Sequence, residues 1–368
     1  MNDWTKIFHL YLVRHVGLHI IGACLVLVFL TGLIDFAEIL NRASNRDSVS
    51  TMMAIAMGLF KLPSSLPVLI PFAVLFGALI SFHKLNHHNE IIIARSGGFS
   101  MPRLVFGPIF LSFVIGVLML IVVDPIASAT SKRYTQMEEQ NFGASSRSLT
   151  VSTEGIWLRD RNDWQNLIVT GATLNRSDDA LIILGGEVFV FSPENTWLTR
   201  YTPTTLSFVD NAWLMEGGTV MRRDGKVLPF ATTTIRSSLT SADLTDSKQK
   251  PATIPFYKLW GYIQVLDQAG LSSLGHRSYL YYQASIPLVL IGMVLIAGYF
   301  ALSYRGRQQR SRLVLIAIAC GLGFYFVKDM MYVFGTSGRL PPWVAGLAPG
   351  MIITSIGLAT LIRADNLS

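Results

Sequence analysis

The sequence predicts an α-helical integral membrane protein with six transmembrane helices and an all-β domain inserted between the third and fourth. Of its 368 residues, 51% are hydrophobic and only 14% are charged, whereas about a quarter of a soluble domain is charged. Six apolar runs are each long enough to cross a hydrocarbon core of roughly 30 Å, which takes about 20 helical residues. Between the third and fourth runs, the long apolar stretches give way to short alternating ones.

The six apolar runs give the positions of the membrane helices. Five of them contain no Asp, Glu, Lys or Arg, and the fifth in chain order contains Lys328 and Asp329. The runs cover residues 16–34, 62–82, 104–123, 278–304, 313–334 and 340–362. The chain is therefore expected to divide into helices 1–3 (1–124), a β domain with its flanking connections (125–276) and helices 4–6 (277–368).

The distribution of basic residues predicts the orientation of the helices. The net charge of +7 comes largely from connections on one side, where the basic residues of the 2–3 and 4–5 loops are Lys84, Arg95, Arg103, Arg305, Arg307, Arg310 and Arg312. Cytoplasmic loops are enriched in Lys and Arg, so both termini and these loops are expected in the cytoplasm and the β domain outside. The charge thus reflects topology and does not indicate a nucleic-acid partner.

The inserted domain has the pattern of short antiparallel strands. Segments such as "GIWLRD", "EVFVFS" and "TTLSFVD" are rich in Val, Ile, Thr, Phe and Trp, and turn signals such as "SPEN" and "RDGK" separate them. Short strands at this spacing indicate a sandwich or barrel of jelly-roll type. Its interior is expected to be either an ordinary packed core or a cavity for an acyl chain.

The loop between the second and third membrane helices contains a very short predicted helix, in the stretch "HHNEIIIARSGGFS" (87–100). Asn89 is placed as its N-cap, Glu90 lies in its first turn, and Gly97 with Gly98 ends it. The helix is expected over 89–96, which is an unusually well-defined structure for a connecting loop.

The second membrane helix contains Pro63, Pro67 and Pro71, four residues apart and therefore on one face. Each proline removes a backbone hydrogen bond, and such breaks are tolerated in a membrane where protein or water satisfies the freed carbonyl groups. A bent helix that lines a cavity and a helix kinked only for packing are both consistent with this pattern.

Basic residues gather at the external end of the helices. Because Arg and Lys pair with phosphate oxygens, they predict contacts to a lipid with an anionic head group. Snorkelling of each side chain to the interface is the alternative, and Lys328 has Asp329 beside it as a partner. The candidates are Arg42, Arg46, Lys61, Arg277 and Lys328.

The sequence does not predict an enzyme or a metal site. It has no Gly-x-x-x-x-Gly-Lys-[Ser/Thr] phosphate loop, Gly-x-Ser-x-Gly or His-Glu-x-x-His motif. His83, His87 and His88 lack further metal ligands apart from Glu90, and a polar interface is expected instead. Cys24 and Cys320 both lie in predicted membrane helices, where small buried residues are expected.

Three segments resemble the lipopolysaccharide export permease family (LptF/LptG, also YjgP/YjgQ) of Gram-negative bacteria. They are "LPVLIPFAVLFGALISFHKLNHHNEIIIARSGGFSMPRL" (66–104), "STEGIWLRD" (152–160) and "GRLPPWVAGLAPGMIITSIGLATLIR" (338–363). These features look more like LptG than LptF, and the likeness follows nearly the whole chain in order.

The resemblance implies a multi-pass subunit of the inner membrane with a periplasmic jelly-roll domain. Its expected partners are an LptF-type permease, a dimer of the LptB-type ATPase, a single-span LptC-type protein and lipopolysaccharide. This chain would bind no cofactor, with ATP and Mg on the ATPase, and membrane helices 1 and 5 would form gates with the partner permease. The coupling helix that docks on the ATPase would carry Glu90, Ile91, Ile92, Ile93, Arg95 and Gly97.

One departure from the family concerns the outer end of the first membrane helix. Many members carry lysines there, whereas this chain reads "IDFAEILNRAS" with Asp35 and Glu38. Two other functions are considered: a mechanotransmitting permease that moves no lipid, which typically has four membrane helices, and a membrane-anchored interaction protein that uses its β domain.

Overall fold

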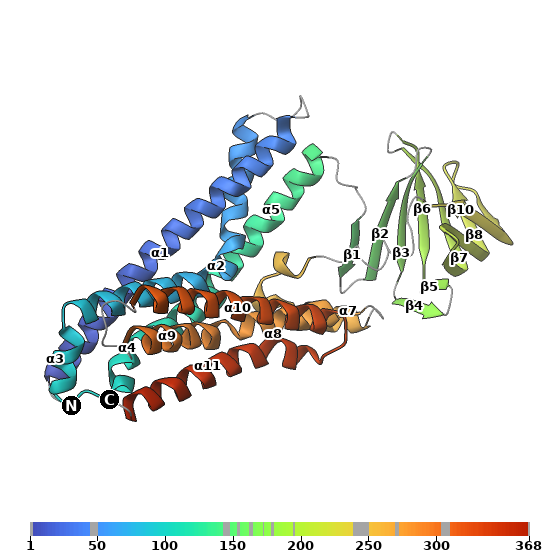
Figure 1. Cartoon of the computed structure of the whole chain (residues 1–368). Helices are drawn as coiled ribbons and strands as arrows, with labels where there is room; N and C mark the ends of the chain where they lie inside the picture. The colour runs from blue at the N-terminus through green and yellow to red at the C-terminus, as the bar shows by residue number, and fades with distance from the viewer. Residues whose placement is uncertain are drawn as a thin grey trace. The chain divides into compact units, whose positions relative to one another are not determined.

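The computed structural model describes residues 3–44, 51–142, 148–152, 155–161, 165–171, 173–177, 180–193, 196–237, 250–268, 272–302 and 310–366. The chain forms two compact units, residues 1–134 with 274–368 and residues 135–273. The first unit is helical, and the ten strands found among the described residues lie in the second (Figure 1).

The helical unit is built from long apolar helices joined by short connections. Its first three membrane segments lie in α1 (Asp3–Ser44), α2 (Thr51–His87) and α4 (Met101–Leu118), and α4 continues through a π-helical turn, η1 (Met119–Val123), into α5 (Asp124–Phe142). The later segments are α8 (Leu274–Ala284), α9 (Ile286–Leu302), α10 (Arg310–Thr336) and α11 (Pro342–Asn366).

Within the described residues, five helices are long and apolar enough to cross a membrane, and the bent pair of α8 and α9 makes a sixth if it is one span. The predicted class of helical membrane protein with a β insertion is confirmed. The fourth predicted run, however, bends by 44° between α8 and α9. Pro287 follows the bend. It has no N–H to donate, and its ring clashes with the preceding helical turn, so α8 cannot continue straight through it. A Cβ added to Gly116 of α4 would lie 2.5 Å from Cα of Pro287, so the two backbones pack directly against each other here.

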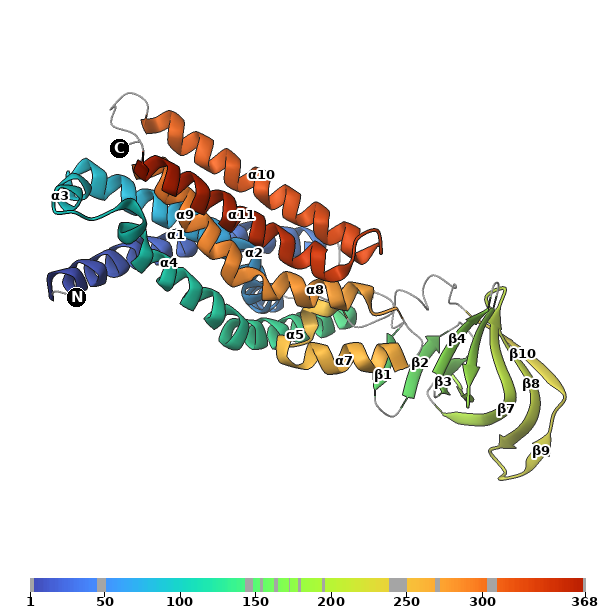
Figure 2. The same cartoon turned by 90° about the horizontal axis from the view of Figure 1, so that it is seen from below.

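Burial differs strongly among the membrane helices. In the most apolar stretch of α2, 61% of the residues are buried within the chain, against 11% in α1 and 17% in α10. The core of the helical unit contains fully buried side chains of α2 and α9 such as Leu75, Val289 and Val294. Figure 2 shows α10 running along α11, with which it packs. The apolar surfaces of α1 and α10 are therefore available to lipid or to another membrane protein.

The second unit contains one ten-stranded antiparallel sheet. Its strands are β1 (Ser148–Ser152), β2 (Gly155–Arg161), β3 (Asn166–Gly171), β4 (Thr173–Ser177), β5 (Ala180–Leu184), β6 (Glu187–Phe191), β7 (Trp197–Val209), β8 (Ala212–Arg222), β9 (Val227–Pro229) and β10 (Thr232–Arg236). The strand order is β1-β2-β3-β6-β7-β5-β4, and β8 pairs with β7, β9 and β10.

The central strand β7 pairs with β8 along its length, and on its other edge with β6 near Thr199 and then with β5 near Leu206. The β7–β8 pair keeps one register along its length, with Pro203 facing Gly218 near its middle, whereas the β6–β7 pair shifts register between Val190 and Phe191. Figure 2 shows the long strands curving. The core between the curved strands contains Trp213 and Phe208, whose ring centroids are 4.8 Å apart. These buried side chains form an apolar core within the described part of the domain.

A helix after the strands completes this core. α7 (Phe256–Gln268) buries Leu259, Ile263 and Leu266, which share one helix face, and Leu266 belongs to the β-domain core. The buried carboxylate of Asp160 accepts hydrogen bonds from Trp213 Nε1 (3.2 Å) and Ser237 Oγ (2.5 Å). These bonds satisfy a polar group that would otherwise be costly to bury.

Replacing Gly218 by alanine is expected to destabilise the β domain by about 2 kcal/mol or more. Gly218 has φ of +115°, and an added Cβ would lie 2.2 Å from the backbone oxygen of Thr202. The apparent melting temperature of the full chain and its protease resistance measure the effect. Gly261→Ala, on α7 with open space around its Cα, is the matched control and should not lower the melting temperature. Equal stability of the two variants would contradict the requirement for glycine at position 218.

Candidate functional site

The loop between α2 and α4 forms the predicted short helix, α3 (Glu90–Ser96). Asn89 precedes it in the left-handed conformation (φ 60°) and makes no side-chain cap, so the predicted N-cap hydrogen bond is absent. At the other end, the N–H of Gly98 donates to the carbonyl of Arg95 and the N–H of Phe99 to that of Ala94. These two bonds form a Schellman motif. The predicted helix and its glycine end are thus present in the structure.

Gly98, at φ +87°, is the residue that this motif requires to be glycine, whereas Gly97 has φ of −81°. Replacing Gly98 by valine is expected to fray α3 and to increase proteolytic cleavage between α2 and α4 several-fold, because a β-branched side chain is strained in the left-handed region. Gly97→Ala is the control and should leave cleavage within about twofold of wild type. Equal cleavage of the two variants would contradict the motif.

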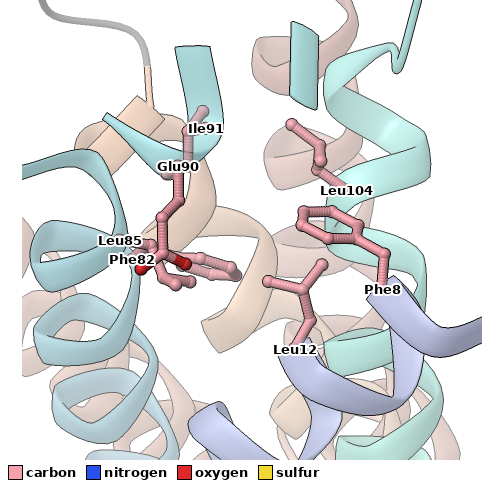
Figure 3. Close-up of a pocket in the computed structure, with 7 residues that line it drawn as sticks. All are labelled: Phe8, Leu12, Phe82, Leu85, Glu90, Ile91 and Leu104. Atoms are coloured by element: carbon pink, nitrogen blue, oxygen red, sulfur yellow. The ribbon is translucent and has the colours of Figure 1, made fainter. Parts of the chain in front are cut away.

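The inner face of α3 closes a small recess. Ile91 and Ala94 are buried. Figure 3 shows Ile91 and Glu90 beside Phe82 and Leu85 of α2, opposite Phe8 and Leu12 of α1 and Leu104 of α4. The helix is therefore anchored by apolar contacts to three membrane helices.

Two polar contacts fix the ends of α3. The hydroxyl of Tyr11 on α1 donates to Oε2 of Glu90 (2.9 Å). At the C-terminal end, Nη2 of Arg95 lies 3.8 Å from Oδ1 of Asp365 at the end of α11, and the same oxygen accepts from the N–H of Met101 (2.9 Å). A carboxylate at the N-terminus of α4 also complements the helix dipole. These contacts connect α3 to α1 and α11, and Asp365 connects α11 in turn to the start of α4.

The outer face of α3 is apolar and exposed. Ile92 and Ile93 are 57% and 67% exposed, although they lie in a loop flanked by exposed polar residues such as His87 and His88. Two adjacent exposed isoleucines on an anchored helix have the chemistry of a knob that fits an apolar groove of another protein.

The structure places the predicted phosphate contacts in different environments. Lys61 of α2 pairs with Asp35 Oδ1 (2.8 Å) and Glu38 Oε2 (3.6 Å) of α1, and its Nζ lies 5.9 Å from the ring centroid of Tyr134. Arg42 pairs with Glu38. Carboxylates of the chain itself therefore pair with both of these basic side chains in the structure.

The remaining basic candidates, Arg277, Arg46 and Lys328, differ in exposure and in whether the structure describes them. Arg277 is exposed on α8, and Arg46 lies outside the described residues. Lys328 on α10 is only 2% exposed, with its Nζ 3.7 Å from the centroid of the Tyr282 ring. Among the described residues no salt bridge joins Lys328 to Asp329.

The three prolines lie within α2, which stays helical from Thr51 to His87. Pro63 and Pro67 are half-buried, and Pro71 is buried in the helical core. Figure 1 shows that α2 changes direction along its length, as expected for a helix that lacks several backbone hydrogen bonds.

Residues important for the geometry of α3 were not found from the sequence. Tyr11 is 79 positions from Glu90, and Asp365 is 264 positions from Met101. No local motif marks either residue. Asp35 and Glu38, by contrast, are visible as unusual acidic residues at the end of an apolar run, and they are the partners of Lys61.

Comparisons with known proteins agree with this architecture. The model of the family described as "Lipopolysaccharide export system permease LptF/LptG" matches residues 10–363. The lipopolysaccharide export system permease protein LptG of Escherichia coli (strain K12) is 21% identical over 351 residues, which cover 92% of this chain and 93% of that protein. LptG of Haemophilus influenzae is also 21% identical, over 359 residues that cover 92% and 94% of the two chains. The chain therefore belongs to the LptF/LptG family of lipopolysaccharide export permeases, and it is LptG-like.

Proposed function

We propose that this chain is the permease subunit of an ATP-driven transporter that extracts lipopolysaccharide from the inner membrane. It passes the lipid to a periplasmic bridge that leads towards the outer membrane. ATP is hydrolysed on a separate LptB-type ATPase dimer, and the chain works with an LptF-type permease and an LptC-type single-span protein. Family membership over residues 10–363 supports this proposal.

The anchored helix α3 is the observation that carries the ATP-driven part of the proposal. Its inner face is buried against α1, α2 and α4, while Ile92 and Ile93 face outwards. Binding of the ATPase on this outer face would move α3 as a rigid lever. A ligand shifts a conformational equilibrium only through its different affinity for the two states, and here that ligand is the nucleotide-bound ATPase.

The weakly buried helices α1 and α10 are proposed to face the LptF-type partner and to act as gates for the lipid. Only 11% and 17% of their most apolar stretches are buried within this chain. A second permease that packs against them would enclose a cavity between the two subunits, which lipid could enter sideways.

The basic residues are proposed to contact the phosphates of the lipid, with Arg42, Lys61 and Arg277 as the accessible members. Because Asp35 and Glu38 already pair with Lys61, a phosphate must displace a carboxylate to bind there. Under the proposed orientation, α3 and both termini lie in the cytoplasm and the β domain lies in the periplasm, as the basic loops favour.

Site-specific photo-crosslinking tests the function. A photoreactive residue at position 61 or 277 should form an adduct with lipopolysaccharide in membranes that contain it, and ATP should reduce the adduct when the ATPase is present. A position on the surface of the β domain far from the sheet interior, such as Lys226, is the control. Absence of adducts at both positions would contradict the lipid cavity and favour a mechanotransmitting or purely structural role.

A further inference from the structure

The contact between Lys328 and Tyr282 joins α10 to α8 in an unusual way. The ammonium group of Lys328 lies 3.7 Å from the centroid of the Tyr282 ring, and the residue is 2% exposed. Burial of an ammonium group is costly unless it is well paired, and a cation–π contact returns only part of that cost. An anionic group could therefore draw the ammonium group of Lys328 away from the Tyr282 ring.

The tyrosine, in contrast, is firmly positioned. The ring of Tyr282 stacks with that of Tyr279 on the same helix (centroids 6.5 Å apart), and it also contacts that of Tyr332 on α10 (5.2 Å). Nε2 of the buried Gln283 donates to the hydroxyl of Tyr279 and to Oδ1 of Asp124, both at 2.9 Å. These bonds link α8 to the start of α5, directly after the π-helical turn η1. Such irregular turns are frequent at functional positions in helices.

The helix that carries Lys328 packs on one side against α11 and α8 and leaves its other side open. Phe326, Met330 and Val333 of α10 are more than half exposed, and α10 is one of the two least buried membrane helices. A specific contact on a helix with so open a face contributes to its position alongside its packing against α11 and the contact between the rings of Tyr325 and Phe72.

We propose that Lys328 and Tyr282 form a latch that holds α10 against α8 and opens when a phosphate group of a bound lipid takes the ammonium. Tyr282 acts as a positioning residue, and the latch couples entry of the lipid to release of the gate helix. This inference rests on the proposed function for the identity of the anion. The latch itself is tested without lipid.

A spin label on the native Cys320 reports on α10. Cys320 is exposed, lies eight positions before Lys328 on the same helix, and becomes the single cysteine once Cys24 is replaced by serine. The full chain is placed in phosphatidylethanolamine vesicles with or without lipopolysaccharide, and in a third sample with inorganic phosphate alone. The label is expected to be immobile in plain vesicles and to become mobile with lipopolysaccharide.

Two substitutions and two matched controls separate the outcomes. Tyr282→Leu should make the label mobile without lipid, whereas Tyr282→Phe, which keeps the ring face, should behave as the unsubstituted chain. Lys328→Met should likewise make the label mobile without lipid and leave no further response to lipopolysaccharide, and Lys328→Arg should restore both the immobile state and the response. Melting temperatures of all variants verify folding, and Lys328→Met serves as the test if Tyr282→Leu does not fold.

A full response in Lys328→Met, or identical mobility of Tyr282→Leu and Tyr282→Phe, would overturn the latch. A response to inorganic phosphate alone would support the latch and contradict its assignment to a lipid. If lipopolysaccharide has no effect on any variant while Tyr282→Leu is mobile in plain vesicles, the latch stands and the proposed function fails.

Discussion

Replacing Ile92 and Ile93 together by aspartate is expected to abolish binding of the ATPase to this chain and, with it, ATP-dependent movement of lipid. Both side chains are exposed, so the isolated chain should fold normally. In the complex, each carboxylate would enter an apolar groove without a partner, and residues at the centre of such interfaces cost at least about 2 kcal/mol each when lost. The two losses together should therefore lower the affinity by about 1,000-fold. Co-purification of the ATPase with the membrane-extracted chain measures this loss.

A charge added beside the knob serves as the control for that experiment. His88 is exposed and precedes α3, so His88→Asp introduces a carboxylate at almost the same place without touching the apolar pair. It should retain the ATPase at near wild-type yield. Glu90→Lys should give an intermediate yield of the ATPase, because Glu90 also accepts the hydrogen bond from Tyr11. Full ATPase yield from the double aspartate variant would show that α3 is not the docking site.

Replacing Lys61 by methionine is expected to lower the stability of the helical unit by about 2 kcal/mol, between the values typical of exposed and buried ion pairs. The side chains of Lys61 and Asp35 are 27% and 13% exposed. Without the ammonium, the Asp35 carboxylate would lose its partner at Oδ1, and its buried Oδ2 has no hydrogen-bond partner among the described residues. A decrease in the apparent melting temperature of the detergent-solubilised chain would report this change.

Restoring neutrality separates the structural role of Lys61 from its proposed role in lipid binding. The double variant Lys61→Met with Asp35→Asn should regain most of the lost stability and still bind less lipopolysaccharide than the unsubstituted chain. Asp35→Asn alone should increase the amount of bound lipopolysaccharide, because a carboxylate that competes with phosphate is gone. Unchanged binding of lipopolysaccharide in all three variants would contradict a phosphate contact at Lys61.

The short helix α3 illustrates what local sequence can predict. Its glycine end and apolar run are encoded within 14 residues, and the structure forms it at Glu90–Ser96. Its anchors are not local, because Tyr11 and Asp365 are brought to it only by packing of the membrane helices. Even the predicted cap at Asn89 depends on backbone geometry, since a left-handed residue cannot place its side chain as an N-cap does.

The apolar runs predicted where the membrane helices lie, but they did not predict the full lengths of the helices or their bends. The first run covers 16–34, whereas α1 extends from Asp3 to Ser44, because its helix continues into polar residues beyond the hydrocarbon. The break at Ala284–Ile286 is hidden inside a continuous apolar run, and only Pro287 hints at it. In the β domain, alternation located the strands, but the pairing of β7 with both β5 and β6 depends on contacts distant in sequence.

ATP-dependent release of lipopolysaccharide from liposomes tests the central claim most directly. Liposomes would contain this chain with its LptF-type and ATPase partners, and an LptC-type acceptor outside would capture the lipid. The account predicts transfer that requires ATP and falls to background when the chain carries Ile92→Asp with Ile93→Asp, while His88→Asp retains it. Transfer at the same rate without ATP, or undiminished transfer by the double aspartate complex, would contradict it.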